Sequence, residues 1–190
     1  TGEIGAGKST LCRALLAEIG DSCATALILN PVMSSLQLLR AILHELGLDD
    51  RGNDRLRLLQ HLDEFLLARV HEGRDVVLII DEAQNLTPAV LEEIRLLSNL
   101  ETVDRKLLQI VLLGQPELRD TLDRAALRQL RQRITVRYHL KPIDRQETEA
   151  YIQHRLAIAG ANGRPTFSRP AIRAIHLYSH GVPRLINAVC

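Results

Sequence analysis

The sequence is poor in several features that would point to particular classes of protein. Its three cysteines, Cys12, Cys23 and Cys190, are scattered and form no C-x-x-C pair, which argues against a disulfide scaffold and favours a reduced, cytoplasmic compartment. Lys and Arg number 24 against 23 Asp and Glu, so the net charge of +1 gives no global attraction to nucleic acid or to a membrane surface. No apolar run approaches the roughly 18 to 20 residues that span a bilayer, and no segment resembles a signal peptide. These absences favour a soluble globular α/β protein whose charged partners bind through local residues.

The first ten residues carry a glycine-rich phosphate-binding pattern. The run "GEIGAGKST", Gly2 to Thr10, fits G-x-x-x-x-G-K-[ST] and leads directly into a segment with helical spacing. In such a loop backbone N–H groups cradle phosphates, the lysine reaches the β and γ oxygens, and the hydroxyl binds Mg²⁺. The residues expected to bind the nucleotide are Gly5, Ala6, Gly7, Lys8, Ser9 and Thr10. The alternative is a chance glycine-rich turn before a helix.

A second motif decides which phosphate chemistry is expected. The apolar run "VVLII" ends in Asp81 and Glu82, about 70 residues after the loop. Asp81 would hold Mg²⁺ together with Ser9, and Glu82 would orient and deprotonate a water. Taken alone, such an acidic pair is often just solvated at the end of a strand. Together with the loop it favours hydrolysis of ATP over a small-molecule kinase, whose nucleophile comes from the substrate.

Gln115 and Asn30 are two further polar residues at the ends of apolar runs that have the length of strands. Gln115 follows the apolar run 107–113, where its side chain would contact the γ-phosphate or the attacking water. It would equally suit an ordinary turn before Pro116. Asn30 ends the run 24–30 and would hydrogen-bond Glu82 and set its orientation, or serve only as a turn residue.

Periodicity along the chain predicts strands alternating with helices up to about residue 140, and helices alone afterwards. The expected strands are 24–30, 76–80, 107–113 and 134–140. The expected helices are 8–20, 34–47, 54–73, 87–100, 141–160 and two within 168–190. This order implies a three-layer α/β P-loop fold with a parallel sheet over residues 1–141 and a small helical lid over 142–190. A phosphate loop normally follows a buried strand, so we expect the first strand of the fold to precede Thr1.

Arginines cluster before the expected lid. Six of them lie between residues 119 and 137, namely Arg119, Arg124, Arg128, Arg131, Arg133 and Arg137. Three interpretations are open: a solvated basic face, an arginine finger that Arg133 contributes to a neighbouring subunit, or contacts to nucleic-acid phosphates. No aromatic residues interleave with the arginines to support stacking on bases. In the lid, Arg184 of "GVPRLIN" would fold back onto the phosphates, or would be a surface charge at a helix start.

The motifs "TGEIGAGKSTL", "LIIDEAQNL", "LLQIVLLGQPEL", "LRQRI", "ETEAYIQHRL" and "GVPRLIN" together resemble the ATPase domain of the general secretion pathway protein A (ExeA-type) family, within the AAA+ class. TniB-type transposition ATPases share much of this pattern. The resemblance implies a five-stranded sheet with a helical lid, working as a homo-oligomer. It also implies that Lys8 and Ser9 are Walker A residues, Asp81 and Glu82 the Walker B pair, Gln115 sensor 1, Arg133 the arginine finger and Arg184 sensor 2.

The expected function is ATP- and Mg²⁺-dependent hydrolysis coupled to assembly or remodelling of a bacterial secretion-type membrane machinery. The resemblance places family members at the inner membrane, through segments outside residues 1–190. One alternative is an ATP-dependent, DNA-binding regulator of transposition. Another is a nucleotide-gated scaffold with negligible hydrolysis, against which the intact Glu82 speaks.

Overall fold

The computed structural model describes residues 1–190, without the side chain of Asp21. Contacts divide the chain into two units. The sheet unit consists of Thr1 and Ser9–Tyr138, and the helical unit consists of Gly2–Lys8 and His139–Cys190. The division into 1–141 and 142–190 stays a prediction about folding domains.

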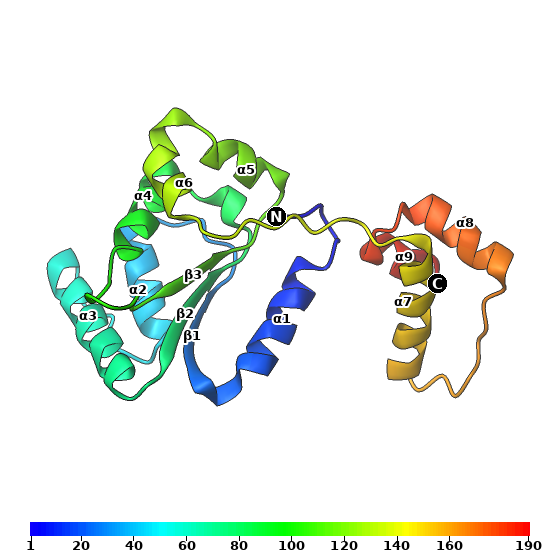
Figure 1. The fold of residues 1–190 in the computed structure, drawn as a ribbon, viewed down its shortest axis with the longest axis horizontal. Helices are drawn as coiled ribbons and strands as arrows, with labels where there is room; N and C mark the ends of the chain where they lie inside the picture. The colour runs from blue at the N-terminus through cyan, green and yellow to red at the C-terminus, as the bar shows by residue number, and fades with distance from the viewer. The chain divides into compact units, whose positions relative to one another are not determined.

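The sheet unit is built on three parallel strands (Figure 1). They are β1 (Cys23–Ile28), β2 (Asp75–Ile80) and β3 (Gln109–Leu112), in the order β1-β2-β3. Ile28 pairs with Ile80 and Ile80 with Leu112, so the carboxyl ends of all three strands meet at one edge. The central strand is buried from Val76 to Ile80 because it has a neighbour on each side and helices over both faces.

The two faces of β2 belong to different cores, as the alternation of side chains in a strand requires. Val76, Leu78 and Ile80 face a large cluster with leucines of α2 (Ser35–Glu45), α3 (Arg55–His71) and α4 (Pro88–Leu97). Val77 and Ile79 face Cys12 and Leu16 of α1 (Lys8–Ile19). Figure 1 shows α1 on the side of the sheet opposite α2, which makes the predicted three layers.

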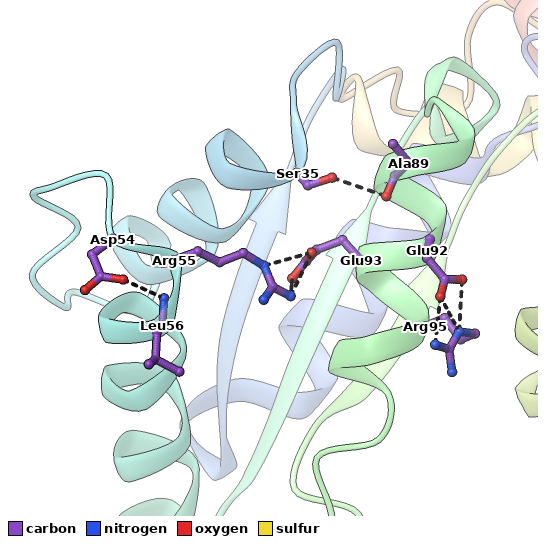
Figure 2. A network of polar contacts seen from close by, with 8 residues as sticks. All are labelled: Ser35, Asp54, Arg55, Leu56, Ala89, Glu92, Glu93 and Arg95. Atoms are coloured by element: carbon purple, nitrogen blue, oxygen red, sulfur yellow. Dashed lines mark hydrogen bonds and ion pairs between the residues drawn. The ribbon is translucent and has the colours of Figure 1, made fainter.

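Polar contacts hold the helices of the larger core together (Figure 2). Arg55, the first residue of α3, binds Glu93 of α4 with Nη2 2.9 Å from Oε1. Glu93 is only 5% exposed, so the guanidinium compensates a carboxylate that burial would otherwise penalise. The Ser35 hydroxyl donates to the carbonyl oxygen of Ala89 at 3.2 Å, which joins the start of α2 to the start of α4.

The helix starts agree with the sequence. Ser34 caps α2 through a capping box with Gln37, and Thr87 caps α4 ahead of Pro88. Two shorter helices, α5 (Pro116–Leu122) and α6 (Arg128–Arg133), complete the unit, with 3₁₀ turns at Gly20–Ser22, Ala83–Asn85 and Ala125–Leu127.

The helical unit contains α7 (Arg145–Ile158), α8 (Arg169–Ser179) and α9 (Pro183–Val189) around a core of Ile152, Ile175 and Ile186. The Gly181 carbonyl accepts a hydrogen bond from Ile143 N at 2.9 Å. Gly181 has φ +73°, and a Cβ there would lie 2.0 Å from the Ile143 carbonyl oxygen. Only glycine fits this turn between α8 and α9.

The expected strand at 134–140 is wrong, because the structure has three strands, β1 to β3, among the residues it describes. Strand-like pairing in this segment is confined to a parallel bridge between Gly2 and Leu140 and a bond from the Thr1 amino group to the Tyr138 carbonyl. The alternating residues Val136 and Tyr138 are 81% and 71% exposed. A strand forms only when a neighbour satisfies its backbone groups, and alternation of residue types does not supply one.

Within the described part of the chain, none of the helices combines the length and the apolar character needed to cross a bilayer.

Candidate active site

The acidic edge of the sheet begins at Asp81, directly after β2. Its backbone N–H donates to the Ile28 carbonyl at 2.9 Å, which continues the pairing with β1 for one more residue. The carboxylate is 5% exposed, and both oxygens have partners: Oδ2 accepts from Ser9 Oγ at 2.7 Å, and Oδ1 from Glu82 N at 2.8 Å. A carboxylate and a hydroxyl in contact are oxygen donors of the kind that Mg²⁺ prefers. The predicted metal ligands Ser9 and Asp81 are therefore together, and their chemistry fits the ion.

The negative charge at Asp81 also affects the neighbouring helix. Burial raises the pKa of the Cys12 thiol, and the charge of Asp81 raises it further. Cys12 therefore stays a neutral thiol that fills space between α1 and β2, as its place in the apolar cluster indicates.

Glu82 stands in an unusual backbone conformation. Its φ of +53° and ψ of +36° lie in the left-handed region, which costs a residue other than glycine roughly 1 to 3 kcal/mol. This bend starts the 3₁₀ turn Ala83–Asn85 and lets Ala83 N donate to the Leu113 carbonyl at 2.8 Å. The Glu82 side chain is thereby held at the junction of β2 and β3, where strain of this kind is often functional.

Two side-chain amides bind the Glu82 carboxylate. Gln84 Nε2 lies 2.5 Å from Glu82 Oε2, and Gln115 Nε2 lies 3.3 Å from the same oxygen. The structure thus brings the predicted residue Gln115 to the predicted base. Gln84 was missed from sequence; the signal for it is its place two residues after Glu82, in a turn that folds back on the strand end.

Of the two interpretations of Asn30, the structure favours the turn residue over a contact with Glu82. The Asn30 carbonyl oxygen Oδ1 instead accepts a hydrogen bond from Asn85 Nδ2 at 3.5 Å. Asn30 has φ +51°, a turn conformation that asparagine tolerates, so its short side chain serves the loop after β1.

The glycine-rich loop belongs to the helical unit up to Lys8. Gly5 and Gly7 have φ of +79° and +99°, which only glycine adopts without strain and which suits a nest of N–H groups for an anion. Lys8 is 8% exposed, and its Nζ donates to the carbonyl oxygens of Gly2 at 2.8 Å and Glu3 at 2.9 Å. Both acceptors are neutral carbonyl oxygens, so they do not neutralise the positive charge of Lys8. The loop therefore fits an anionic ligand.

Arg184 lies against this loop. Its backbone N–H donates to the Gly5 carbonyl at 3.3 Å, and a Cβ at Gly5 would lie only 2.6 Å from the Cβ of Arg184. The start of α9 therefore needs a glycine at position 5. The arginine side chain is exposed.

Arg133 ends α6 with an exposed side chain. Other arginines of the cluster form ion pairs within it: Arg131 and Arg137 lie 3.4 and 3.8 Å from Asp123.

The pKa of Glu101 is lowered, mainly by the hydrogen bond from Lys106, with a smaller contribution from Arg133.

A parallel sheet with acids at the carboxyl end of its central strand, and a glycine-rich loop leading into a helix, define a P-loop nucleotide-binding fold. Within that class, the chain belongs to the AAA domain family, which matches residues 1–122. This confirms the predicted class, an AAA+ ATPase.

Comparison with known proteins also confirms the resemblance drawn from the motifs. The chain is 47% identical over 191 residues to General secretion pathway protein A of Aeromonas hydrophila. The match covers 100% of this chain and 35% of that protein, so the chain spans about a third of its relative's length.

Two solved structures share the fold. The ORC2 protein of Aeropyrum pernix aligns with a TM-score of 0.68 and 19% identity over 99% of this chain and 54% of its own. Cdc6p from Pyrobaculum aerophilum aligns with a TM-score of 0.61 and 20% identity over 83% of this chain and 42% of its own.

Proposed function

We propose that this chain binds Mg²⁺ and ATP and hydrolyses the nucleotide. The observation that carries the proposal is the contact of the Ser9 hydroxyl with a buried Asp81 carboxylate, one residue before the strained Glu82. AAA domain membership supports the same activity.

Each loop residue has a role in binding. The N–H groups of Gly5, Ala6, Gly7 and Thr10, with those of Lys8 and Ser9, would hold the phosphates, since the left-handed glycines turn the backbone toward an anion. Lys8 brings a buried positive charge whose present partners are neutral carbonyls. Ser9 and Asp81 would hold Mg²⁺, which when bound neutralises charge that develops on the phosphate oxygens.

Glu82 is the proposed general base. Its carboxylate orients the attacking water and accepts its proton, and the amide of Gln115 keeps the carboxylate in place. Arg184, whose backbone binds the loop at Gly5, would add positive charge beside the phosphates.

Arg133 is proposed to act in trans within a homo-oligomer. Its side chain is exposed at the end of α6, and Asp123 takes up Arg131 and Arg137 instead. An arginine offered by a neighbouring subunit would stabilise transition-state charge.

The biological role proposed is work on a secretion-type assembly, which the name of the relative, General secretion pathway protein A, supports. A location at the bacterial inner membrane is proposed from the motif resemblance alone. A role on DNA is the second candidate, favoured by the exposed side chains of Arg124, Arg128 and Arg133.

The proposal is tested with Lys8→Ala and the unchanged chain. We expect Lys8→Ala to lose binding of a fluorescent ATP analogue by at least about 100-fold, because the phosphates lose their buried cation. Binding within threefold of the unchanged chain would contradict the assignment. Adding DNA duplex to the ATPase assay separates the two roles: stimulation that falls steeply as salt rises supports the DNA role, and its absence supports the secretion-linked one.

A further inference from the structure

We propose that Gln84 is a positioning residue that fixes the carboxylate of Glu82 for the hydrolytic step and joins it to Gln115. The inference rests on the proposed function, in which Glu82 is the base. Gln84 lies within the motif "LIIDEAQNL", but neither the motifs nor the family comparison assigns it a role.

The Gln84 carboxamide is hydrogen-bonded at both its nitrogen and its oxygen. Its Nε2 donates to Glu82 Oε2 at 2.5 Å, and its Oε1 accepts from the backbone N–H of Gln115 at 3.0 Å. Gln115 in turn donates from Nε2 to the same Glu82 oxygen at 3.3 Å. The three residues close a ring of hydrogen bonds between the end of β2 and the end of β3, in which Gln84 bonds to both of the other members.

Gly114 lies beside the Gln84 side chain. A Cβ at Gly114 would lie 3.1 Å from Gln84 Oε1 and 2.8 Å from Leu118 Cδ2. Gly114 therefore leaves room beside the Gln84 amide, and a Cβ there would press on Gln84 Oε1 and force it to shift by a few tenths of an ångström. A carboxamide with both ends bonded and its flank against a backbone keeps one rotamer.

The two oxygens of the Glu82 carboxylate differ in their bonding to the neighbouring glutamines. Both amides bind Oε2, which leaves Oε1 as the oxygen that we assign to the attacking water. A glutamate has three rotatable bonds, and the left-handed backbone fixes only where its side chain starts. The bond from Gln84 removes the remaining freedom, so its loss is expected to slow the chemical step and to leave nucleotide affinity unchanged.

The test is a double-mutant cycle of Gln84→Met and Glu82→Gln, in single-turnover hydrolysis and in binding of a fluorescent ATP analogue. Methionine keeps the length of glutamine and removes its donor and acceptor. Gln84→Glu keeps the acceptor for Gln115 N–H and removes the donor to Glu82. Gln153→Met, at an exposed position of α7, is the matched control.

We expect Gln84→Met and Gln84→Glu to slow hydrolysis by roughly tenfold or more, with affinity and melting temperature close to those of the unchanged chain. In the Glu82→Gln background, Gln84→Met should have no further effect, because the group it positions is gone. Gln153→Met should behave like the unchanged chain.

The inference is overturned if Gln84→Met leaves the rate unchanged, slows both backgrounds by the same factor, or weakens nucleotide binding in proportion to the rate. If Glu82→Gln hydrolyses ATP slowly and Gln84→Met hydrolyses it at the rate of the unchanged chain, the role of Gln84 is overturned and the proposed base is not. Normal turnover by Glu82→Gln overturns the proposed base, and the role of Gln84 with it.

Discussion

At the scale of single residues, the hydroxyl of Ser9 at the start of α1 contacts the acidic end of β2. It donates to Asp81 Oδ2 at 2.7 Å, and the carboxylate is buried, so each group fixes the other before any ion arrives. This preorganisation is what a weakly held, strongly hydrated ion such as Mg²⁺ requires.

Ser9→Ala should raise the Mg²⁺ concentration for half-maximal phosphate release by roughly tenfold or more, because one oxygen ligand and the partner of Asp81 are lost together. Ser9→Thr keeps the hydroxyl and should stay close to the unchanged chain. The measurement is phosphate release against free Mg²⁺. An unchanged midpoint for Ser9→Ala would show that the hydroxyl does not bind the ion.

At the scale of elements, α3 and α4 are joined by an ion pair that is buried on one side. Glu93 is 5% exposed, whereas the Arg55 side chain is 46% exposed. The pair thus depends on a partly exposed arginine, which Figure 2 shows extending from the start of α3 toward Glu93 of α4. Removing the arginine leaves a buried carboxylate without compensation.

Arg55→Ala should lower the free energy of unfolding by about 2 to 3 kcal/mol, measured by urea denaturation. Adding Glu93→Gln should recover part of the loss, because it removes the uncompensated charge. Arg95→Ala, which breaks the pair with Glu92 inside α4, is the control and should cost clearly less than Arg55→Ala. Equal losses for Arg55→Ala and Arg95→Ala would contradict a special role for the buried pair.

Sequence patterns predicted elements well where the signal is local. The Thr87-Pro88 start of α4 and the capping box from Asp144 to Glu147 at the start of α7 depend on neighbours along the chain. The segment 134–140 has the alternation of a strand, but a strand also needs a partner, and partners are not encoded locally.

The candidate site shows the same limit. Ser9, Asp81 and Glu82 follow from motifs because a fixed loop and a strand end determine where they lie. The partner of Glu82 does not follow, because it depends on a left-handed turn that folds Gln84 back and on a glycine at position 114 that makes room for it. Asn30, like Gln115, is a polar residue that follows a strand in the sequence, but its side chain binds Asn85 and not Glu82.

At the scale of the whole molecule, the proposed homo-oligomer would complete each site with Arg133 of a neighbour. Lys8→Ala and Arg133→Ala proteins should each be inactive alone. When they are mixed in equal amounts, about a quarter of the contacts would pair an intact Lys8 with a neighbour's intact Arg133, so roughly that fraction of phosphate release should return. Activity no greater than the sum of the separate proteins would show that Arg133 does not act in trans.

Glu82 is proposed to activate water in a site that binds Mg²⁺ and ATP. The most direct measurement is single-turnover hydrolysis by Glu82→Gln, with binding of a fluorescent ATP analogue measured on the same protein. We expect an affinity within about threefold of that of the unchanged chain and hydrolysis slower by at least about 100-fold, since an amide cannot accept the proton. Hydrolysis by Glu82→Gln at the rate of the unchanged chain would contradict the proposed role of Glu82.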